Sequence, residues 1–345
     1  MRKFNSKSCE EIMTTVYKPI EFVVNCLIGQ GLYILAGAPK IGKSWLSLDI
    51  CLSIAKGKKV LGHETQCGTA LYLCLEDSFE RIQKRLYELT DEPTNKLHFV
   101  IMSDSIGSGL EEQITDFKSN HTDLKIVFID TLQKIRESTE NSYGSDYKEL
   151  SILKILADNL GIAIVLVHHT RKCSDSDPFN MISGSTGLSG CVDGSMVLVE
   201  RKRGSRIAKL YCVGRDIENT EITLQFNVDL KKWVVTDEPT AAKSKDNIFL
   251  AAVYLFIKVE IHFEGSATEL VEQLKSVNDE EFHSNHVTRE LVQNGYTLKK
   301  YGIDFQYKRV YGGRKIILHY NRERDSSDNK NGSEVTVTKQ LAKVL

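Results

Sequence analysis

Short apolar runs alternate with helical patterns between about residues 31 and 170. Each run is continuous rather than alternating with polar positions, which is typical of strands buried on both faces of a sheet. Strand–helix–strand repetition favours a parallel sheet with right-handed crossovers, so the chain is predicted to have an α/β fold. The predicted strands cover residues 32–36, 70–75, 97–101, 125–129 and 162–167, and the predicted helices cover residues 43–56, 78–90, 110–120 and 146–160.

The pattern changes after residue 190. Residues 195–200 and 206–212 predict a β-hairpin, and residues 221–226 and 232–235 predict two further short strands. The polar, aperiodic stretch that follows predicts a linker. These boundaries divide the first part of the chain into an N-terminal lead over residues 1–21, a core over residues 22–236 and a linker over residues 237–246.

Residues 247–321 predict a second, smaller unit. A very apolar helix begins it, and Ser266-Ala-Thr-Glu269 is a capping box that opens a second helix. A third helix is predicted from Ser284 towards Lys300, followed by a hairpin over residues 305–310 and 314–320. Three helices and a two-stranded wing are the order of a winged helix, so we expect a winged-helix-like (α+β) domain here. Residues 322–345 are rich in Asp, Ser, Asn and Gly and predict a disordered tail.

Charge and cysteine usage narrow the class of protein. The 345 residues hold 45 Lys and Arg against 46 Asp and Glu, which excludes a uniformly basic nucleic-acid coat but permits a local basic patch. No apolar run approaches the roughly 18 residues of a membrane span, and no apolar stretch follows the first residues as in a secretory signal. Eight scattered cysteines without a C-x-x-C pair predict a reduced, cytoplasmic protein. A zinc site at His283-x-x-His286 would need further ligands.

The strongest chemical signal is Gly37-Ala38-Pro39-Lys40-Ile41-Gly42-Lys43-Ser44, followed by Trp45. It fits the phosphate-loop pattern G-x-x-x-x-G-K-[ST], and it lies between a predicted strand and a predicted helix, as that motif requires. The glycines let backbone N–H groups approach phosphate oxygens. Lys43 is predicted to reach the β- and γ-phosphates, and the Ser44 hydroxyl to ligate Mg²⁺.

Acidic and histidine side chains follow three other predicted strands. Asp130 ends one strand and is predicted to hold Mg²⁺ through water, although an Asp at this place can also cap a helix. Glu76 directly ends another strand, which favours it over Asp77 for orienting the attacking water, while the other acid caps the next helix. His168 and His169 end a third strand, where they could sense the γ-phosphate or, with Cys173, bind zinc.

In this order, these motifs resemble the RecA/DnaB-like P-loop NTPase core, and most closely the RepA-type replicative helicases of plasmids and other mobile elements. The resemblance covers residues 22–236 and also includes Gly184-Ser-Thr-Gly187 and Gly214-Arg215-Asp216. It implies ATP and Mg²⁺ as cofactors, with Glu76 as the catalytic glutamate and Asp130 as the Walker B acid. It also implies that His168 or His169 is the γ-phosphate sensor, without deciding between them.

The resemblance further implies contacts with DNA and with neighbouring subunits. Residues 133–143 and 183–190 would be DNA-facing loops, and Arg215 an arginine finger offered to a neighbour. Arg201, Arg203 and Arg206 compete for that role, and a surface salt bridge is the alternative for Arg215. In the first of these loops no single residue is singled out; in the second the nominated DNA contacts are Ser183, Gly184, Ser185 and Thr186.

The second unit carries a basic patch of its own. Residues 296–324 hold eight Lys and Arg against two Asp and Glu, a net charge of +6, with tyrosines interleaved. Such a hairpin could contact DNA phosphates, although a solvated basic face or a subunit contact would have the same composition. The nominated residues are Lys308, Arg309, Arg314 and Lys315.

Together these features predict a Mg-dependent ATPase that moves on single-stranded DNA as a homo-oligomeric, hexameric ring. A replication initiator or a primase is a further candidate partner, and no membrane partner is expected. Two rival interpretations remain open from the sequence. One is an ATP-switched DNA-binding loader or regulator that does not unwind DNA, and the other is a RadA-like recombination ATPase.

Overall fold

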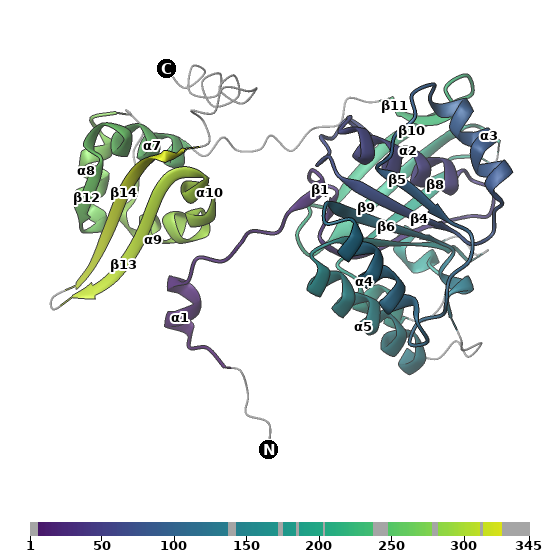
Figure 1. Ribbon diagram of the computed structural model, residues 1–345, viewed down its shortest axis with the longest axis horizontal. Helices are drawn as coiled ribbons and strands as arrows, with labels where there is room; N and C mark the ends of the chain where they lie inside the picture. The colour runs from purple at the N-terminus through teal and green to yellow at the C-terminus, as the bar shows by residue number, and fades with distance from the viewer. Residues whose placement is uncertain are drawn as a thin grey trace. The chain divides into compact units, whose positions relative to one another are not determined.

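The computed structural model describes residues 6–136, 143–171, 175–183, 186–202, 204–236, 248–277, 282–310 and 313–325. The chain divides into two compact units, which are Ile20–Ala242 and the combination of Met1–Pro19 with Lys243–Leu345 (Figure 1). None of the helices in the described ranges is long and apolar enough to cross a membrane.

The larger unit is built on a nine-stranded sheet with the order β11-β10-β9-β8-β3-β7-β6-β4-β5. The strands from β8 to β5 in this order are mutually parallel, and β9, β10 and β11 extend the sheet as antiparallel strands. The predicted α/β fold with a mainly parallel sheet is confirmed. The strands are β3 (Gly31–Gly37), β4 (Thr69–Cys74), β5 (Leu97–Val100), β6 (Leu124–Asp130), β7 (Ala163–His169), β8 (Gly194–Glu200), β9 (Ile207–Gly214), β10 (Thr220–Asn227) and β11 (Lys232–Val235). A small separate ladder pairs β1 (Phe22–Val24) with β2 (Ile28–Gly29).

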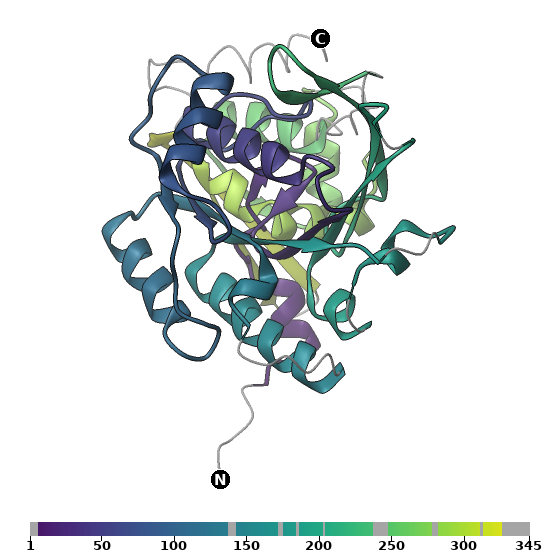
Figure 2. The same ribbon diagram turned by 90° about the vertical axis from the view of Figure 1, so that its right-hand side faces the viewer.

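Helices cover both faces of this sheet, which is why its strands are apolar at every position. Tyr33 and Leu35 of β3 pack on one face with α2 (Lys43–Lys56) and α3 (Phe79–Leu89). Leu32 and Ile34 pack on the other face. That face is covered by α4 (Leu110–Asn120), α5 (Tyr143–Leu160) and α6 (Thr186–Cys191), and Figures 1 and 2 show α4 and α5 lying together there.

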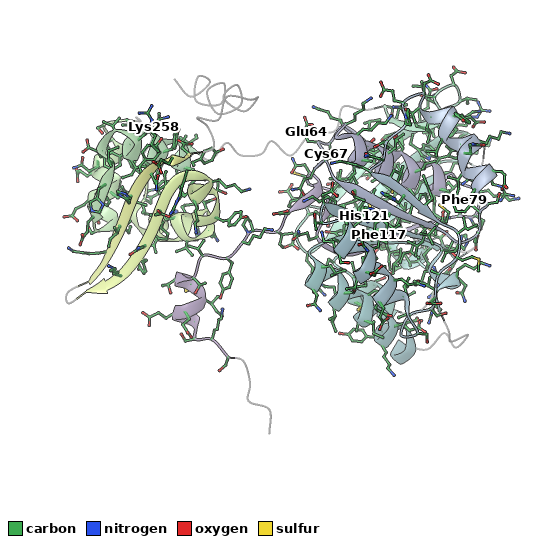
Figure 3. All side chains as sticks on the ribbon, in the orientation of Figure 1. Glu64, Cys67, Phe79, Phe117, His121 and Lys258 are labelled. Carbon is green, nitrogen blue, oxygen red and sulfur yellow. The ribbon has the colours of Figure 1, made fainter. Side chains whose placement is uncertain are left out.

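The ends of these helices follow from local chemistry. α2 ends at Gly57, whose positive φ of 62° favours glycine and whose N–H returns to the Ile54 carbonyl. α4 ends at His121, whose ring stacks on Phe117 at a centroid distance of 4.1 Å (Figure 3). Phe117 in turn partly buries itself against the core of that face.

The smaller unit has its own apolar core beneath a three-stranded antiparallel sheet of order β12-β14-β13. Leu270, Leu291 and Leu318 are fully buried in that core. The predicted capping box is present, because Ser266 and Glu269 bond each other's backbone N–H groups. The elements are α7 (Ile248–Glu260), β12 (His262–Gly265), α8 (Ala267–Leu274), α9 (Ser284–Gln293), α10 (Gly295–Lys300), β13 (Tyr301–Val310) and β14 (Gly313–Asp325).

Three features of this unit differ from the sequence-based expectation. β12 is not among the predicted strands, because His262–Gly265 has one large apolar residue and shows no run. The single helix expected from Ser284 to Lys300 is two helices, α9 and α10, divided at Asn294. The strand β14 continues to Asp325, four residues into the expected tail, because the Tyr254 and Tyr320 hydroxyls each donate to the buried Asp325 carboxylate at 2.8 Å. The remaining tail, residues 326–345, lies outside the described residues.

The N-terminal segment belongs with the smaller unit rather than forming a separate lead. It contains the short helix α1 (Cys9–Thr14), which begins with a capping box between Ser8 and Glu11. Beyond α1, the Val16 side chain lies against Gly295 of α10. This contact joins two parts of the chain that are almost 280 residues apart.

Candidate active site

The register of four parallel strands brings the predicted chemical groups to one edge of the sheet. Gly37 at the end of β3 lies opposite His169 of β7, and Asp130 at the end of β6 lies opposite Val167 of β7 and Cys74 of β4. Glu76 follows two residues after β4. The phosphate loop, the two acids and the histidine pair therefore meet beyond the carboxyl ends of the strands, where ligands bind in open α/β sheets.

The phosphate loop joins β3 to α2 and has space only for backbone at two positions. A Cβ atom on Gly37 would lie 2.9 Å from the Leu198 carbonyl oxygen. Gly42 has a φ of 102°, and a Cβ there would lie 3.0 Å from the Trp233 indole nitrogen. Lys40, where many phosphate loops carry glycine, also has a positive φ of 64°. The loop thus presents backbone N–H groups at the N-terminus of α2, and this geometry fits an anionic phosphate.

Lys43 is buried beneath this loop and points towards the carboxyl edge. Its ammonium donates to the carbonyl oxygens of Gly37 at 2.7 Å and Ala38 at 3.0 Å. Burial lowers the pKa of Lys43 to about 8, and the carboxylates of Asp130 and Glu76 oppose part of that shift. The side chain is therefore mainly a cation at neutral pH, and phosphate oxygens would stabilise its charged form further.

Ser44 and Asp130 form a pair suited to holding magnesium. The Ser44 hydroxyl donates to Oδ2 of Asp130 at 2.8 Å. Hydroxyl and carboxylate oxygens are ligands that Mg²⁺ prefers, completed by phosphates and water. The donor set therefore fits the predicted cofactor, with Ser44 and Asp130 as the residues that would hold it.

Tyr72 is a member of the site that sequence reasoning missed. Its hydroxyl donates to the same Asp130 oxygen at 2.9 Å, from the fourth residue of β4. Burial, with Asp130 close by, raises the pKa of Tyr72 well above its usual value, so the phenol stays a donor. The only sequence signal is one hydroxyl within an apolar run, and the partner of such a group depends on strand order.

The two neighbouring acids after β4 have different surroundings. Asp77 forms ion pairs with Arg81 at 3.0 Å and Arg85 at 2.5 Å. Glu76 instead accepts a long hydrogen bond of 3.4 Å from the Thr131 hydroxyl, next to Asp130. Glu76 therefore lies on the Asp130 side, while Asp77 is held by α3. The expected helix cap is wrong for Ser78, which is the N-cap of α3 but makes no side-chain cap.

The histidine pair divides between the phosphate loop and the following segment. Nδ1 of His169 lies 3.5 Å from the Lys43 ammonium. Nε2 of the buried His168 lies 2.8 Å from the Ser183 carbonyl oxygen, and its Nδ1 has no partner among the described residues. Burial lowers the pKa of both imidazoles, so both are neutral at neutral pH.

No metal set surrounds either histidine pair within the described residues. No group of three or more His, Cys, Asp and Glu side chains there is placed to hold a metal ion. Cys173, the third zinc ligand considered with His168 and His169, lies outside the described residues. The rings of His283 and His286 have centroids 5.9 Å apart.

The expected second DNA loop is partly helical. Thr186 to Gly190 lie in α6, and Leu188 is buried in the core beside α5, so those residues are not an extended loop as expected. Ser183 stays at the base of the segment, because its N–H donates to the His169 carbonyl at 3.1 Å. Gly184 and Ser185 lie outside the described residues, as does the Thr186 side chain.

The expected first DNA loop is anchored by a buried ion pair. Gln133 and Lys134 lie in the 3-10 helix η1 (Leu132–Lys134). Arg136, 2% exposed, contacts the carboxylates of Asp146 and Glu149 of α5, each at 2.6 Å. Residues 137–142 lie outside the described residues.

The candidate arginine fingers lie at opposite ends of the sheet. Leu198 of β8 pairs with Gly37, so the turn that carries Arg201 and Arg206 lies at the phosphate-loop end. Arg203 lies outside the described residues. Arg215 follows β9 at the other end, where its half-exposed side chain contacts Asp193 at 3.4 Å. Its ion-pair partner is therefore Asp193, not Asp216 or Glu218 as the salt-bridge alternative assumed.

The basic hairpin of the smaller unit has a regular register. Lys308 of β13 lies opposite Lys315 of β14, and Arg309 lies opposite Arg314. Lys308 and Lys315 are exposed, and Lys315 forms an ion pair with Glu264 at 3.0 Å. The side chains of Arg309 and Arg314 are outside the described part of the chain.

Comparisons with known proteins agree with this architecture. Residues 13–175 match a family described as an AAA domain. The fold is similar to that of a solved helicase ATPase domain, with a TM-score of 0.51 and 14% identity. The alignment covers 60% of this chain and 85% of that chain. At this identity the likeness is one of fold, and with the family match it supports a P-loop ATPase core.

The different surroundings of Glu76 and Asp77 lead to a first prediction. Glu76→Gln should retain ATP binding and lose about 10²-fold or more in kcat, because the amide cannot accept a proton from water. Asp77→Asn should remove only its ion pairs with Arg81 and Arg85, which are worth about 0.2–1 kcal/mol each when solvent-exposed. Phosphate release and fluorescent-nucleotide binding measure both effects. The opposite ranking would assign the water-orienting role to Asp77.

The two histidines lead to a second prediction. His169→Ala should lower basal kcat at least tenfold, as removal of a polar catalytic contact does. His168→Ala should mainly lower the thermal midpoint, because the Ser183 carbonyl would lose its buried partner at a cost of about 1–3 kcal/mol. Steady-state hydrolysis without DNA and thermal unfolding separate the two variants. Equal losses of kcat would contradict the division.

Proposed function

We propose that this protein is a Mg-dependent ATPase of the helicase type, of the RepA kind, that moves on single-stranded DNA as a homo-oligomeric ring. The observation that carries the proposal is the meeting of four groups at one sheet edge: Lys43, the Ser44–Asp130 pair, Glu76 and His169. The similarity to a helicase ATPase domain supports the same class of enzyme. Its role is in the replication of a plasmid, phage or other mobile element.

The residues divide the chemistry of ATP hydrolysis between them. The phosphate-loop N–H groups and Lys43 bind the β- and γ-phosphates. Glu76 accepts the proton of the water that attacks the γ-phosphorus, and the bond from that phosphorus to the β–γ bridging oxygen breaks. Magnesium, when bound, supplies charge neutralisation to the phosphate oxygens. Tyr72 keeps the Asp130 carboxylate oriented towards Ser44 through its hydrogen bond.

The histidine pair connects the state of the nucleotide to a DNA-facing segment. His169 is the γ-phosphate sensor, since it lies beside Lys43. His168 is bonded to the Ser183 carbonyl, and Ser183 returns a hydrogen bond to His169. A shift of the end of β7 on loss of the γ-phosphate would therefore move Ser183, the first nominated DNA contact of the following segment.

The position of Arg215 supports a ring of subunits. It lies at the end of the sheet opposite the phosphate loop of its own chain, with more than half of its side chain exposed. It cannot reach its own nucleotide, so it acts on that of a neighbour. Arginine fingers supplied between subunits stabilise the charge on the transferring phosphoryl group. A hexamer is the ring size that the RepA-type resemblance implies.

The smaller unit is the proposed winged-helix module that binds DNA phosphates. Its hairpin presents Lys308 and Lys315 at opposite positions of paired strands. Phosphate contacts of this kind position a protein on DNA without reading its sequence. A replication initiator or a primase remains a candidate partner of the ring.

Unwinding is the direct test of this function. The protein with ATP and Mg²⁺ should displace the labelled strand of a forked DNA, and Lys43→Ala should abolish both hydrolysis and displacement. DNA-stimulated hydrolysis without displacement on any fork would favour the loader or regulator that does not unwind. Strand exchange between homologous duplexes in place of displacement would favour the recombination ATPase.

The arginine finger gives a separate prediction. Arg215→Ala should retain nucleotide binding and lose about 10³-fold or more in kcat, as removal of a finger does. Mixing it with Lys43→Ala protein should restore some activity, because one interface of a mixed ring combines an intact phosphate loop with an intact finger. The matched control is Arg206→Ala, which lies at the other end of the sheet. No restoration in any mixture, with a monomeric mass in ATP and single-stranded DNA, would contradict the ring.

A further inference from the structure

The helix α9 of the smaller unit buries apolar side chains on two faces. Val287 and Leu291 enter the core of the unit. Val292 is also buried, with 8% of its surface exposed, yet it is not part of that core. Val292 continues a stripe of Ser284 and Thr288 at helical spacing of four residues, so α9 has a second packed face.

The N-terminal segment, residues 8–19, covers this second face. A groove of about 780 Å³ runs between the segment and α9, and both sides line it. From the segment come Ile12, Met13 and Tyr17, and from α9 come Thr288, Arg289 and Val292. Beside the groove, the γ-methyl groups of Val16 close over the buried Gly295, so tightly that a Cβ atom there would lie 2.7 Å from one of them.

The contact has the character of a removable cover. Ile12 is 51% exposed, Met13 67% and Tyr17 46%, so the segment leaves about half of its large apolar surface in solvent. None of the α1 residues is buried. A few partly buried apolar side chains provide a few kcal/mol at most, which a competing ligand can overcome.

The covered face is continuous with the basic hairpin. Tyr307 of β13 and Ile316 of β14 line the same groove, and each is adjacent in sequence to Lys308 or Lys315. An exposed α-helix of this kind fits the major groove of duplex DNA, and the flanking cations fit its phosphates. The N-terminal segment and a DNA duplex would therefore occupy the same surface.

We propose that residues 8–19 are the resident occupant of the α9 face and that duplex DNA must displace them to bind there. The DNA part of this inference rests on the function proposed for the smaller unit. The segment thereby lowers the affinity for duplex DNA by the fraction of molecules in which α9 is covered. A segment docked in nine of ten molecules weakens binding about tenfold.

A size exchange between Val16 and Gly295 tests the contact in the full chain. Gly295→Ala places a methyl group against Val16 and should release the segment; Ala is a better helix former than Gly, so α10 should remain folded. Val16→Ala should release it partly. The double variant should restore docking relative to Gly295→Ala, because the removed methyl groups leave space for the new one. Hydrogen exchange of residues 8–19 measures docking.

Binding of a labelled duplex of about 30 base pairs at fixed salt measures the consequence. Gly295→Ala should bind about tenfold more tightly than the parent protein, and the double variant should lie between the two. Cys9→Asp is the matched control, since it changes an exposed residue of the same helix that does not line the groove. It should leave both docking and duplex affinity unchanged.

Two results would overturn the inference. One is a segment whose hydrogen exchange is the same in the parent and in Gly295→Ala. The other is a released segment with duplex affinity equal to that of the parent. If no variant binds any DNA while exchange responds to the size exchange, the DNA role proposed for this unit fails and competition fails with it. Loss of ATP hydrolysis alone would affect only the proposed function of the core.

Discussion

The hydrogen-bonded register of β3, β7, β6 and β4 is the constraint on which the candidate site depends. It places Gly37 opposite His169 and Asp130 opposite Val167 and Cys74. A slip of one residue in any of these pairings would turn a strand's side chains to the other face. The register is secured by cores on both faces of the sheet, so the packing of apolar side chains fixes the geometry of the polar ones.

Adjacent residues with similar chemistry have separate tasks because the backbone turns between them. His169 lies beside Lys43, and its neighbour His168 is bonded into the following segment. Glu76 lies next to Thr131, while Asp77 is held by the arginines of α3. In each pair, one side chain is available to a nucleotide and the other fixes the position of the peptide between them. Such pairs connect events at the phosphate to the loops that follow.

The same economy of contacts governs the smaller unit. Its core is complete without the N-terminal segment, since α1 contributes no buried residue. The segment nevertheless lies over α9, and Gly295 is the point where its approach is closest. A surface that is packed only lightly can serve two ligands in turn, because the free energy of displacement stays small. The proposed DNA-binding unit would thereby be coupled to the start of the chain.

The sequence by itself determined the parallel sheet, the phosphate loop, the capping box at Ser266 and the strand-end positions of Asp130 and Glu76. These features depend on periodicity, on glycine and on residues within a few positions of one another, so they are legible along the chain. Only the tertiary structure decided that Tyr72 bonds Asp130, that His169 is the histidine beside Lys43 and that Arg215 lies far from its own phosphate loop. It also decided the contact of Val16 with Gly295. Each of these depends on strand order and on packing between distant segments, and no local pattern of side chains encodes them.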